Sequence, residues 1–484
     1  MKVKILRLGT NGEGVFEMSE GKDKGKIAFV DFALPDEIAD IKIVNNKSKF
    51  AVAKLNNIET VSKFRVAPKC KYFGTCGGCD LQHMEESYQD NFKINKVKFA
   101  LKKYITDFDV QLVTTCKCNY RNKMVFPFAM RDGQVYLGMY QRNTHNVIDI
   151  DYCMLARDTI NKVLSVAKEF FKNSKYVVYD EKSKTACLKY LVVRELNDEI
   201  LVSVVCKSKC DMSDFYSVLA KNFEKVGLNI VISNSDKDIM SGTIYKSYGL
   251  TAIQLEDYWI KYEINNFSFL QVNQDIKHML YDEVLSHVNS DIVIDAYSGA
   301  GLLSAIISKN ARHVIGIEIN KDATNSANKL KLANNIKNIE YINGDTKVVL
   351  PSILEKYTNS DLVLDPARSG CDKQVLLDII NSKNKPSKII YISCNLATLK
   401  RDLDILTEKY TVTSIKCFDM FPYTKHIETL VCLQGQAWRC VLWSPSAREE
   451  HILEGRRGIC YKYNTRRTSG ARTSVKMSLG FEII

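Results

Sequence analysis

Short apolar segments alternate with longer amphipathic ones through the second half of this 484-residue chain, and no other feature constrains its fold as strongly. The first helical patterns among them begin at Leu302 and Asp322. Strands that alternate with helices generally run parallel and are covered on both faces. The pattern therefore predicts a doubly wound, mostly parallel, Rossmann-like α/β domain over residues 261–434. Its strands are expected at 292–296, 314–317, 339–342, 362–364 and 389–392.

The rest of the chain has different patterns, and its length predicts a multidomain protein. Residues 1–59 contain short strands separated by turns, which predicts an OB-like β-barrel. Residues 60–260 begin with an irregular stretch and then mix strands with helices, which predicts an α+β central domain. Within it, residues 85–104 have the pattern of a long polar helix, which we expect to pack on the α/β domain.

No apolar run is long enough to span a membrane, and residues 1–7 lack the apolar core of a signal peptide. These two features predict a cytoplasmic protein. In the cytoplasm a disulfide framework is not expected, so most of the 15 cysteines are interpreted as small core residues. The formal net charge of +12 favours a polyanionic partner, although Lys-rich and Asn-rich sequences are often basic for genomic reasons.

A glycine-rich turn, Asp295-Ala296-Tyr297-Ser298-Gly299-Ala300-Gly301, follows the first apolar strand of the α/β domain. Glycines at this place allow a ligand to approach the backbone, and Glu318, at the end of the next strand, can bind ribose hydroxyls. Asp345, after the third strand, can face an adenine. Ser304 replaces the third glycine of the dinucleotide fingerprint, which favours S-adenosylmethionine over NAD.

Three further segments are expected at strand ends of the same sheet. They are 361–370 with Asp365-Pro366, 389–395 with Cys394, and 419–428 with Glu428. Ligand sites in open α/β sheets lie at the carboxyl ends of the strands. A cysteine alone is more often a buried thiol, but its coincidence with these segments favours a nucleophile with a nearby carboxylate as base.

Three cysteines, Cys70, Cys76 and Cys79, lie close together with glycines between them, and Cys153 follows later. This arrangement suits a four-thiolate site, and spacing alone leaves zinc and an iron–sulfur cluster open. The spacing differs from the Cys-x3-Cys-x2-Cys of radical enzymes, so radical methylation is disfavoured.

Together these motifs resemble the RNA uracil-C5 methyltransferase family, in particular its 23S rRNA branch with an iron–sulfur cluster. The resemblance runs to about residue 434 and includes Leu270-Gln271-Val272-Asn273 and Ser393-Cys394-Asn395. It departs at Ala367 and Leu396, where the family usually or often has proline. The barrel resembles a TRAM domain, an RNA-binding module.

The resemblance implies an S-adenosylmethionine-dependent enzyme that makes 5-methyluridine. Its nucleophile would be Cys394, which adds to carbon 6 of a flipped-out uridine, and Glu428 would take the proton from carbon 5. It also favours a [4Fe–4S] cluster over zinc. The implied cofactor contacts are Gln271, Tyr297, Glu318 and Asp365, to which the strand pattern adds Asp345, and the implied cluster ligands are Cys70, Cys76, Cys79 and Cys153.

The expected partner is RNA, bound by a monomer. Candidate contacts are a basic loop with Lys22, Lys24 and Lys26 and the segments 120–123 and 142–145. Three other functions stay open: methylation of tRNA uridine, methylation of a small molecule, and a non-catalytic role in RNA binding or ribosome assembly. The barrel and cysteine cluster argue against the first two, and intact Cys394 and Glu428 argue against the third.

The last 50 residues, 435–484, differ in composition from the rest of the chain. They contain seven arginines and only two lysines, whereas residues 1–434 contain ten arginines. Their low apolar content without periodicity predicts a disordered, appended stretch. The alternative is a basic arm that contacts phosphates.

Overall fold

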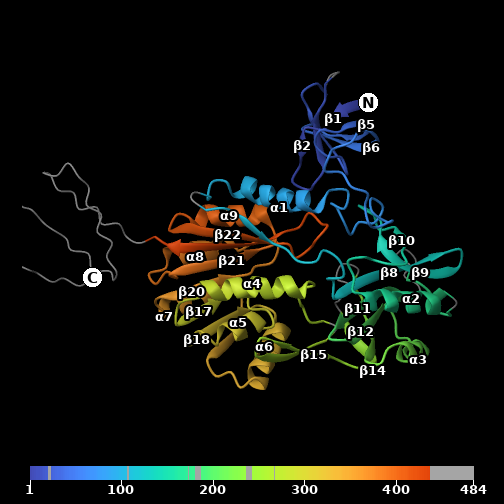
Figure 1. Ribbon diagram of the computed structural model, residues 1–484. Coiled ribbons are helices and arrows are strands. Elements are labelled where there is room, and N and C mark those ends of the chain that lie inside the picture. The colour runs from blue at the N-terminus through green and yellow to red at the C-terminus, as the bar shows by residue number, and fades with distance from the viewer. Residues whose placement is uncertain are drawn as a thin grey trace, which may run out of the picture. The chain divides into compact units, whose positions relative to one another are not determined.

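The second half of the chain forms most of an eight-stranded, mostly parallel sheet (Figure 1). In this computed structural model its strand order is β19-β18-β17-β20-β21-β23-β22-β7, and β23 runs antiparallel to both of its neighbours. The apolar runs that predicted a doubly wound sheet form five of its strands, β17 to β21. The bounds are β17 Ile292–Asp295, β18 His313–Glu318, β19 Ile339–Asn343, β20 Ser360–Leu364, β21 Lys388–Ser393, β22 Tyr410–Phe418 and β23 Glu428–Gly435.

Alternate residues of the strands point to opposite faces, and helices bury both faces. Ile292 and Ile294 of β17 lie in one apolar core with α1, α7, α8 and α9, whereas Val293 lies in a second core with α4, α5 and α6. The helices are α4 Gln274–His287, α5 Leu302–Ile307, α6 Lys321–Ala333, α7 Thr346–Lys356, α8 Lys373–Asn381 and α9 Leu396–Leu406.

Two elements from the first quarter of the chain complete this sheet. Helix α1 (Glu86–Leu101) packs on α9, and strand β7 (Gln111–Val113) pairs in parallel with β22. Lys93 of α1 is buried with Asp419, and its Nζ lies 2.5 Å from Oδ1 of the aspartate. The helix is thus fixed to the segment that leads from β22 to β23.

The central part of the chain forms a seven-stranded sheet in the order β10-β9-β8-β11-β12-β13-β14, with its own apolar core against α2 and α3. A separate hairpin, β15 (Ile253–Asp257) and β16 (Ile260–Ile264), follows it. The other elements are β8 Lys123–Arg131, β9 Gln134–Tyr140, β10 Val147–Asp149, α2 Asp158–Lys172, β11 Leu188–Leu196, β12 Glu199–Cys206, α3 Ser213–Asn222, β13 Val226–Ile232 and β14 Thr243–Gly249.

The N-terminal segment forms a six-stranded sheet in the order β1-β5-β6-β4-β3-β2 around a small apolar core. Only β4 and β6 pair in parallel. The strands are β1 Lys2–Lys4, β2 Arg7–Leu8, β3 Gly14–Glu17, β4 Ile27–Val30, β5 Ile38–Asn46 and β6 Ala51–Thr60.

The structure describes residues 1–19, 23–105, 108–172, 174–179, 187–235, 242–265 and 267–436. Met1–Gly435 forms one unit. The predicted disordered tail, 435–484, began too early, because Gly435 pairs as the last residue of β23. Residues 437–484 of that prediction lie outside the described residues. No helix in the described part of the chain is long and apolar enough to cross a membrane.

Candidate active site and cysteine cluster

The side chains expected to carry the chemistry come together at one edge of the eight-stranded sheet. Asp365 and Cys394 directly follow the parallel strands β20 and β21, and the antiparallel β23 begins at Glu428 on the same edge. Ser393 pairs with Thr429, so this register places Cys394 beside Glu428. The sheet thus aligns a thiol with a carboxyl group.

Burial sets the protonation of these groups. Glu428 is 7% exposed, and burial raises its pKa to about 7, although the charge of Arg368 opposes the shift. Partial burial and the charge of Glu428 raise the pKa of the Cys394 thiol, and Arg368 again opposes. Asp365 remains accessible to solvent, yet the protein around its carboxyl and the charges of Glu428 and Asp295 raise its pKa.

Arg368 is thus the nearby cation that favours the charged forms of both Cys394 and Glu428. Arg368 lies in the segment 361–370, which was expected at a strand end, but no role was predicted for it. Its place two residues beyond Asp365-Pro366 was the only available signal.

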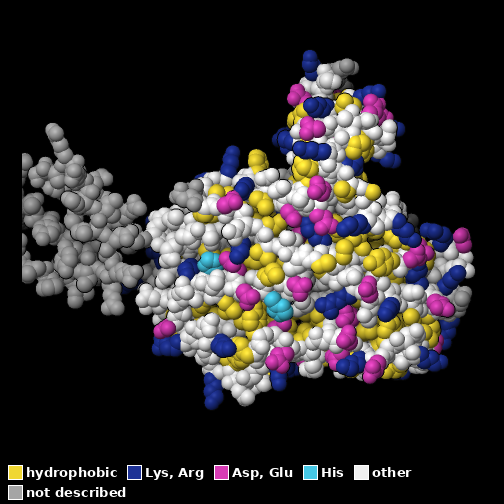
Figure 2. Space-filling model, in the orientation of Figure 1, with side chains coloured by type: hydrophobic (Ala, Val, Ile, Leu, Met, Phe, Trp, Pro, Cys, Tyr) yellow, Lys and Arg dark blue, Asp and Glu magenta, His cyan; other side chains and the backbone are white. Residues whose placement is uncertain are grey.

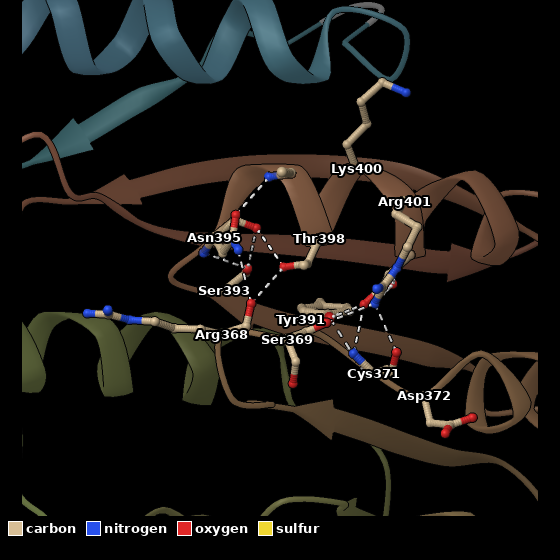
Figure 3. Close-up of polar contacts among 12 residues, drawn as sticks. Arg368, Ser369, Cys371, Asp372, Tyr391, Ser393, Asn395, Thr398, Lys400 and Arg401 are labelled. Carbon is tan, nitrogen blue, oxygen red and sulfur yellow. Dashed lines mark hydrogen bonds and ion pairs between the residues drawn. The ribbon is translucent and has the colours of Figure 1, made fainter. Parts of the chain in front are cut away.

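The turn after Cys394 is tied to the loop that carries Arg368 (Figure 3). Asn395 caps α9, where its Oδ1 accepts from the Ala397 N–H, and its Nδ2 donates to the Arg368 carbonyl at 3.0 Å. The Thr398 hydroxyl donates to the same carbonyl. These bonds connect the two turns where the expected prolines are absent.

A buried carboxylate, Asp402 of α9, holds the next part of that loop. It accepts from the Cys371 N–H at 2.9 Å, from the Tyr391 hydroxyl at 2.6 Å and from Arg401. Because the group has three donors, its burial leaves no unmet hydrogen bond. Asp402 therefore holds the loop at Cys371 against α9.

The glycine-rich turn has the geometry that a ligand-binding turn requires. Gly299 and Gly301 have φ values of 54° and 83°, and a Cβ at Gly301 would lie 2.5 Å from the Tyr341 hydroxyl. The hydroxyl of Ser304 donates to buried Asp295 at 2.6 Å, so the serine that replaces a third glycine stabilises the turn.

The five proposed cofactor contacts lie at or near this edge. Glu318 accepts from the Gly299 and Asn320 N–H groups, and Asp345 caps α7 by accepting from the Lys347 N–H. Tyr297 is half-buried against the core under α8 and α9. Gln271 precedes α4, and its carbonyl accepts from Asn122.

Cys70, Cys76, Cys79 and Cys153 line one pocket of the described chain, with Arg121 and the apolar side chains of Tyr72, Phe73 and Met139 around them. No three of these four sulfurs all lie within 4.8 Å of one another. Burial raises the pKa of Cys79 to about 12 and also raises those of Cys76 and Cys153.

The cysteine segment supports the loop that leads to Glu428. The N–H groups of Asp80 and Leu81 both donate to the Tyr423 carbonyl, at 2.9 and 3.0 Å. The Asp80 carboxylate accepts from the Lys425 N–H. The two sites are therefore connected by direct hydrogen bonds.

Several of the expected RNA contacts lie inside the protein, which corrects their interpretation. Tyr120 and Asn122 are 7% and 0% exposed, and they pack under the Tyr423 loop and the Gln271 segment. Lys26 bonds Asp23 and Asn46 within the N-terminal sheet, and Arg142 pairs with Asp31 and Asp80. Lys24 is exposed, and Lys22 lies outside the described residues.

The chain is similar to known RNA methyltransferases in sequence and in fold. The tRNA (uracil-5-)-methyltransferase family model matches residues 87–436. An uncharacterized RNA methyltransferase of Clostridium tetani is 33% identical, over 89% of this chain and 95% of that protein. One of Halalkalibacterium halodurans is 31% identical, over 90% and 96%. A crystal structure of Pyrococcus abyssi tRNA (uracil-54, C5)-methyltransferase with S-adenosyl-L-homocysteine is similar with a TM-score of 0.74 and 26% identity, over 90% of this chain and 99% of that one.

The fold and the matching relatives define an S-adenosylmethionine-dependent RNA methyltransferase with a multidomain α/β architecture. The chain belongs to the tRNA (uracil-5-)-methyltransferase family.

Proposed function

We propose that this enzyme methylates carbon 5 of a specific uridine in 23S rRNA through a covalent bond between Cys394 and carbon 6 of the base. The observation that carries the mechanism is the strand register that sets Cys394 beside buried Glu428. S-adenosylmethionine supplies the methyl group. We assign its binding to Gln271, Tyr297, Glu318, Asp345 and Asp365.

The proposed roles follow from the chemistry of uracil. Carbon 5 is a poor nucleophile until the Cys394 thiolate adds to carbon 6, which moves the π electrons into an enolate. Carbon 5 then takes the methyl group, the carboxylate of Glu428 removes the hydrogen from carbon 5, and the thiolate leaves. Arg368 favours the ionised forms of both residues, so it assists the addition and the proton transfer.

The residues present fit a [4Fe–4S] cluster. Around a single zinc ion the four sulfurs would be about 3.8 Å apart, given Zn–S bonds of about 2.3 Å. The wider spread of Cys70, Cys76, Cys79 and Cys153 favours a larger group with four thiolate ligands. We assign such a cluster a structural role, which includes support of the loop at Tyr423.

The proposed RNA-binding surface includes the N-terminal sheet, which we interpret as a TRAM-like barrel. On the face shown in Figure 2, Lys and Arg side chains are mixed with acidic ones and do not form a single basic patch. Shape and base flipping are therefore expected to contribute to recognition along with phosphate contacts. We propose that a monomer acts in the cytoplasm.

Methylation of tRNA is the second candidate, and a specific observation favours it. The structure of the Pyrococcus tRNA (uracil-54, C5)-methyltransferase covers 90% of this chain. A multidomain architecture like this one thus occurs in an enzyme named for a tRNA substrate, and the barrel alone does not favour rRNA.

Nucleoside mass spectrometry on a deletion strain tests the proposal. We expect 5-methyluridine to be lost from one position in 23S rRNA and to return with the full-length gene, while tRNA keeps its own. Loss from tRNA alone would establish the second candidate. No loss from either RNA would contradict both.

A further inference from the structure

Three cysteines of the central sheet lie together, apart from the four cysteines assigned to the cluster. Cys187 precedes β11, Cys206 ends β12 and Cys210 follows in the next turn. The Sγ atom of Cys210 lies 3.3 Å from that of Cys187 and 3.5 Å from that of Cys206, and all three sulfurs lie within 4.8 Å of one another.

The backbone fixes this arrangement. Leu188 pairs with Cys206 in the antiparallel β11–β12 ladder, and the Lys207 N–H donates to the Cys187 carbonyl at 2.8 Å. Cys206 is fully buried, whereas Cys187 and Cys210 are half-buried. Two strands and one turn therefore present the three thiols to a common point that solvent can reach.

We propose that Cys187, Cys206 and Cys210 form a mononuclear site for a thiophilic cation such as Zn²⁺, with solvent as the fourth ligand. Tetrahedral thiolates at Zn–S distances of about 2.3 Å lie about 3.8 Å apart, so the observed separations need to grow by only a few tenths of an ångström. A disulfide instead requires sulfurs at about 2.05 Å and leaves one thiol unpaired.

The charges around the three thiols suit this occupant. Three thiolates and one Zn²⁺ carry a net charge of −1, and Lys207 and Lys209 lie in the turn between Cys206 and Cys210. Lys189 extends from β11, and its ammonium and that of Lys207 both lie 5.4 Å from the centre of the Tyr179 ring. Asp211, which follows Cys210, is itself paired with Lys246 at 2.5 Å. The charges of Lys207 and Lys209 in the turn therefore remain to lower the cost of holding an anionic complex.

The site is separated from the chemistry by the length of β11. Near the other end of this strand, Arg194 donates to the Ser268 carbonyl, close to Gln271. Seven residues of strand span roughly 23 Å. The metal should therefore connect β11 to the turn after β12 and stabilise the folded chain without changing the methylation rate. Metal binding at these three thiols is independent of the RNA substrate.

The test uses the full chain, purified without oxygen and washed with a weak chelator. Elemental analysis should find one Zn²⁺ per chain in the wild type and in a control with exposed Cys116→Ser, but none bound in Cys210→Ser. In thermal unfolding, added Zn²⁺ should raise the melting temperature of the wild type and of Cys116→Ser but not that of Cys210→Ser. Equal zinc content in the wild type and Cys210→Ser would overturn the proposal.

Alkylation of the wild type gives a second measurement in case Cys210→Ser does not fold. Zn²⁺ should slow the reaction of Cys187 and Cys210 with iodoacetamide at least tenfold, as read by peptide mass spectrometry, and leave Cys116 unchanged. Unchanged rates at Cys187 and Cys210, or a Cys206–Cys210 disulfide in their place, would refute the site.

Discussion

At the scale of single residues, the thiol of Cys394 is the group that the proposed reaction depends on. Cys394→Ala removes the nucleophile but none of the residues assigned to the cofactor. We expect the methylation rate to fall by roughly 10⁴-fold or more, the order seen when a catalytic nucleophile is removed. Calorimetry should find unchanged affinity for S-adenosylmethionine, and Cys116→Ala is the control. An active Cys394→Ala enzyme would exclude the mechanism.

Glu428 gives a prediction about the order of the chemical steps. Glu428→Gln keeps the shape of the side chain but has no base, so addition and methyl transfer proceed while the proton stays on carbon 5. A covalent complex with RNA, stable in SDS, should then accumulate on gels. Its absence in this variant would remove Glu428 from the role of base.

The raised pKa of Glu428 also links stability to pH. The folded pKa of about 7 lies above the ordinary value of 4.5, so the folded state holds this proton more tightly. Its contribution to stability is complete below pH 4.5 and is lost as the pH rises through 7. Glu428→Gln should therefore be more stable than the wild type at pH 8, by about 1–3 kcal/mol, with no gain at pH 4. Urea unfolding at pH 4 and at pH 8 measures this difference in stability. An equal effect of the substitution at the two pH values would contradict the shifted pKa.

At the scale of elements, a buried ion pair is one of the contacts that join α1 to the segment before β23. Lys93 and Asp419 are each 1% exposed, and burial lowers the pKa of the lysine and raises that of the aspartate. Asp419→Asn leaves the lysine without its charged partner and should cost about 3–5 kcal/mol. The exposed Lys103–Asp404 pair is the control, because Lys103→Ala should cost at most about 1 kcal/mol.

Replacing both members of the buried pair, in Lys93→Met with Asp419→Leu, should restore much of the stability, since no charge is then left unpaired. Denaturant titration of the single and double variants measures the coupling. Additive losses would show that the pair is not the source of the effect.

The periodicity of the sequence predicted the strands of the α/β domain, but not which distant segments pair with them. The apolar runs identify β17, β18, β20 and β21, because these strands are buried on both faces. The edge strand β19 was also predicted, although only Ile339 of its residues is fully buried. The short β7 has no such signal, and its place beside β22 depends on a pairing distant in sequence. Arg121 and Arg142 look like surface cations in the sequence, and only the fold shows the cluster pocket and the acids near them.

The two cysteine groups also differ in how far the sequence alone predicts them. Cys70, Cys76 and Cys79 are close in sequence, so the pattern alone predicts a shared site. Cys187 joins Cys206 and Cys210 only through the β11–β12 ladder, and the sequence grouped all three with ordinary core residues. The Cys206-x3-Cys210 spacing was the one available signal.

At the scale of the whole molecule, the proposed cluster connects the central domain to the catalytic edge. Protein purified without oxygen should be brown, and Cys76→Ser or Cys79→Ser should bleach it and lower its solubility, since the ligands tie residues 70–79 to Cys153. Methylation should fall as well, because the Tyr423 carbonyl is held by Asp80 and Leu81. Colourless protein whose zinc disappears in Cys76→Ser would contradict the iron–sulfur assignment.

The eight-stranded sheet ends at Gly435, before the arginine-rich C-terminal segment. Gly435 closes β23, where its N–H donates to the Ser387 carbonyl at 3.0 Å, and the family match ends at residue 436. A chain that ends after Gln436 keeps every element of the Met1–Gly435 unit. The removed segment, 437–484, contains seven of the 17 arginines and has a net charge of +5. We expect cofactor affinity, iron content and methylation rate to remain within about twofold of the full chain, because none of the assigned residues is removed. RNA binding measured across a salt series is the decisive comparison. Weaker binding with a flatter salt dependence in the shortened chain would show that residues 437–484 contact phosphates.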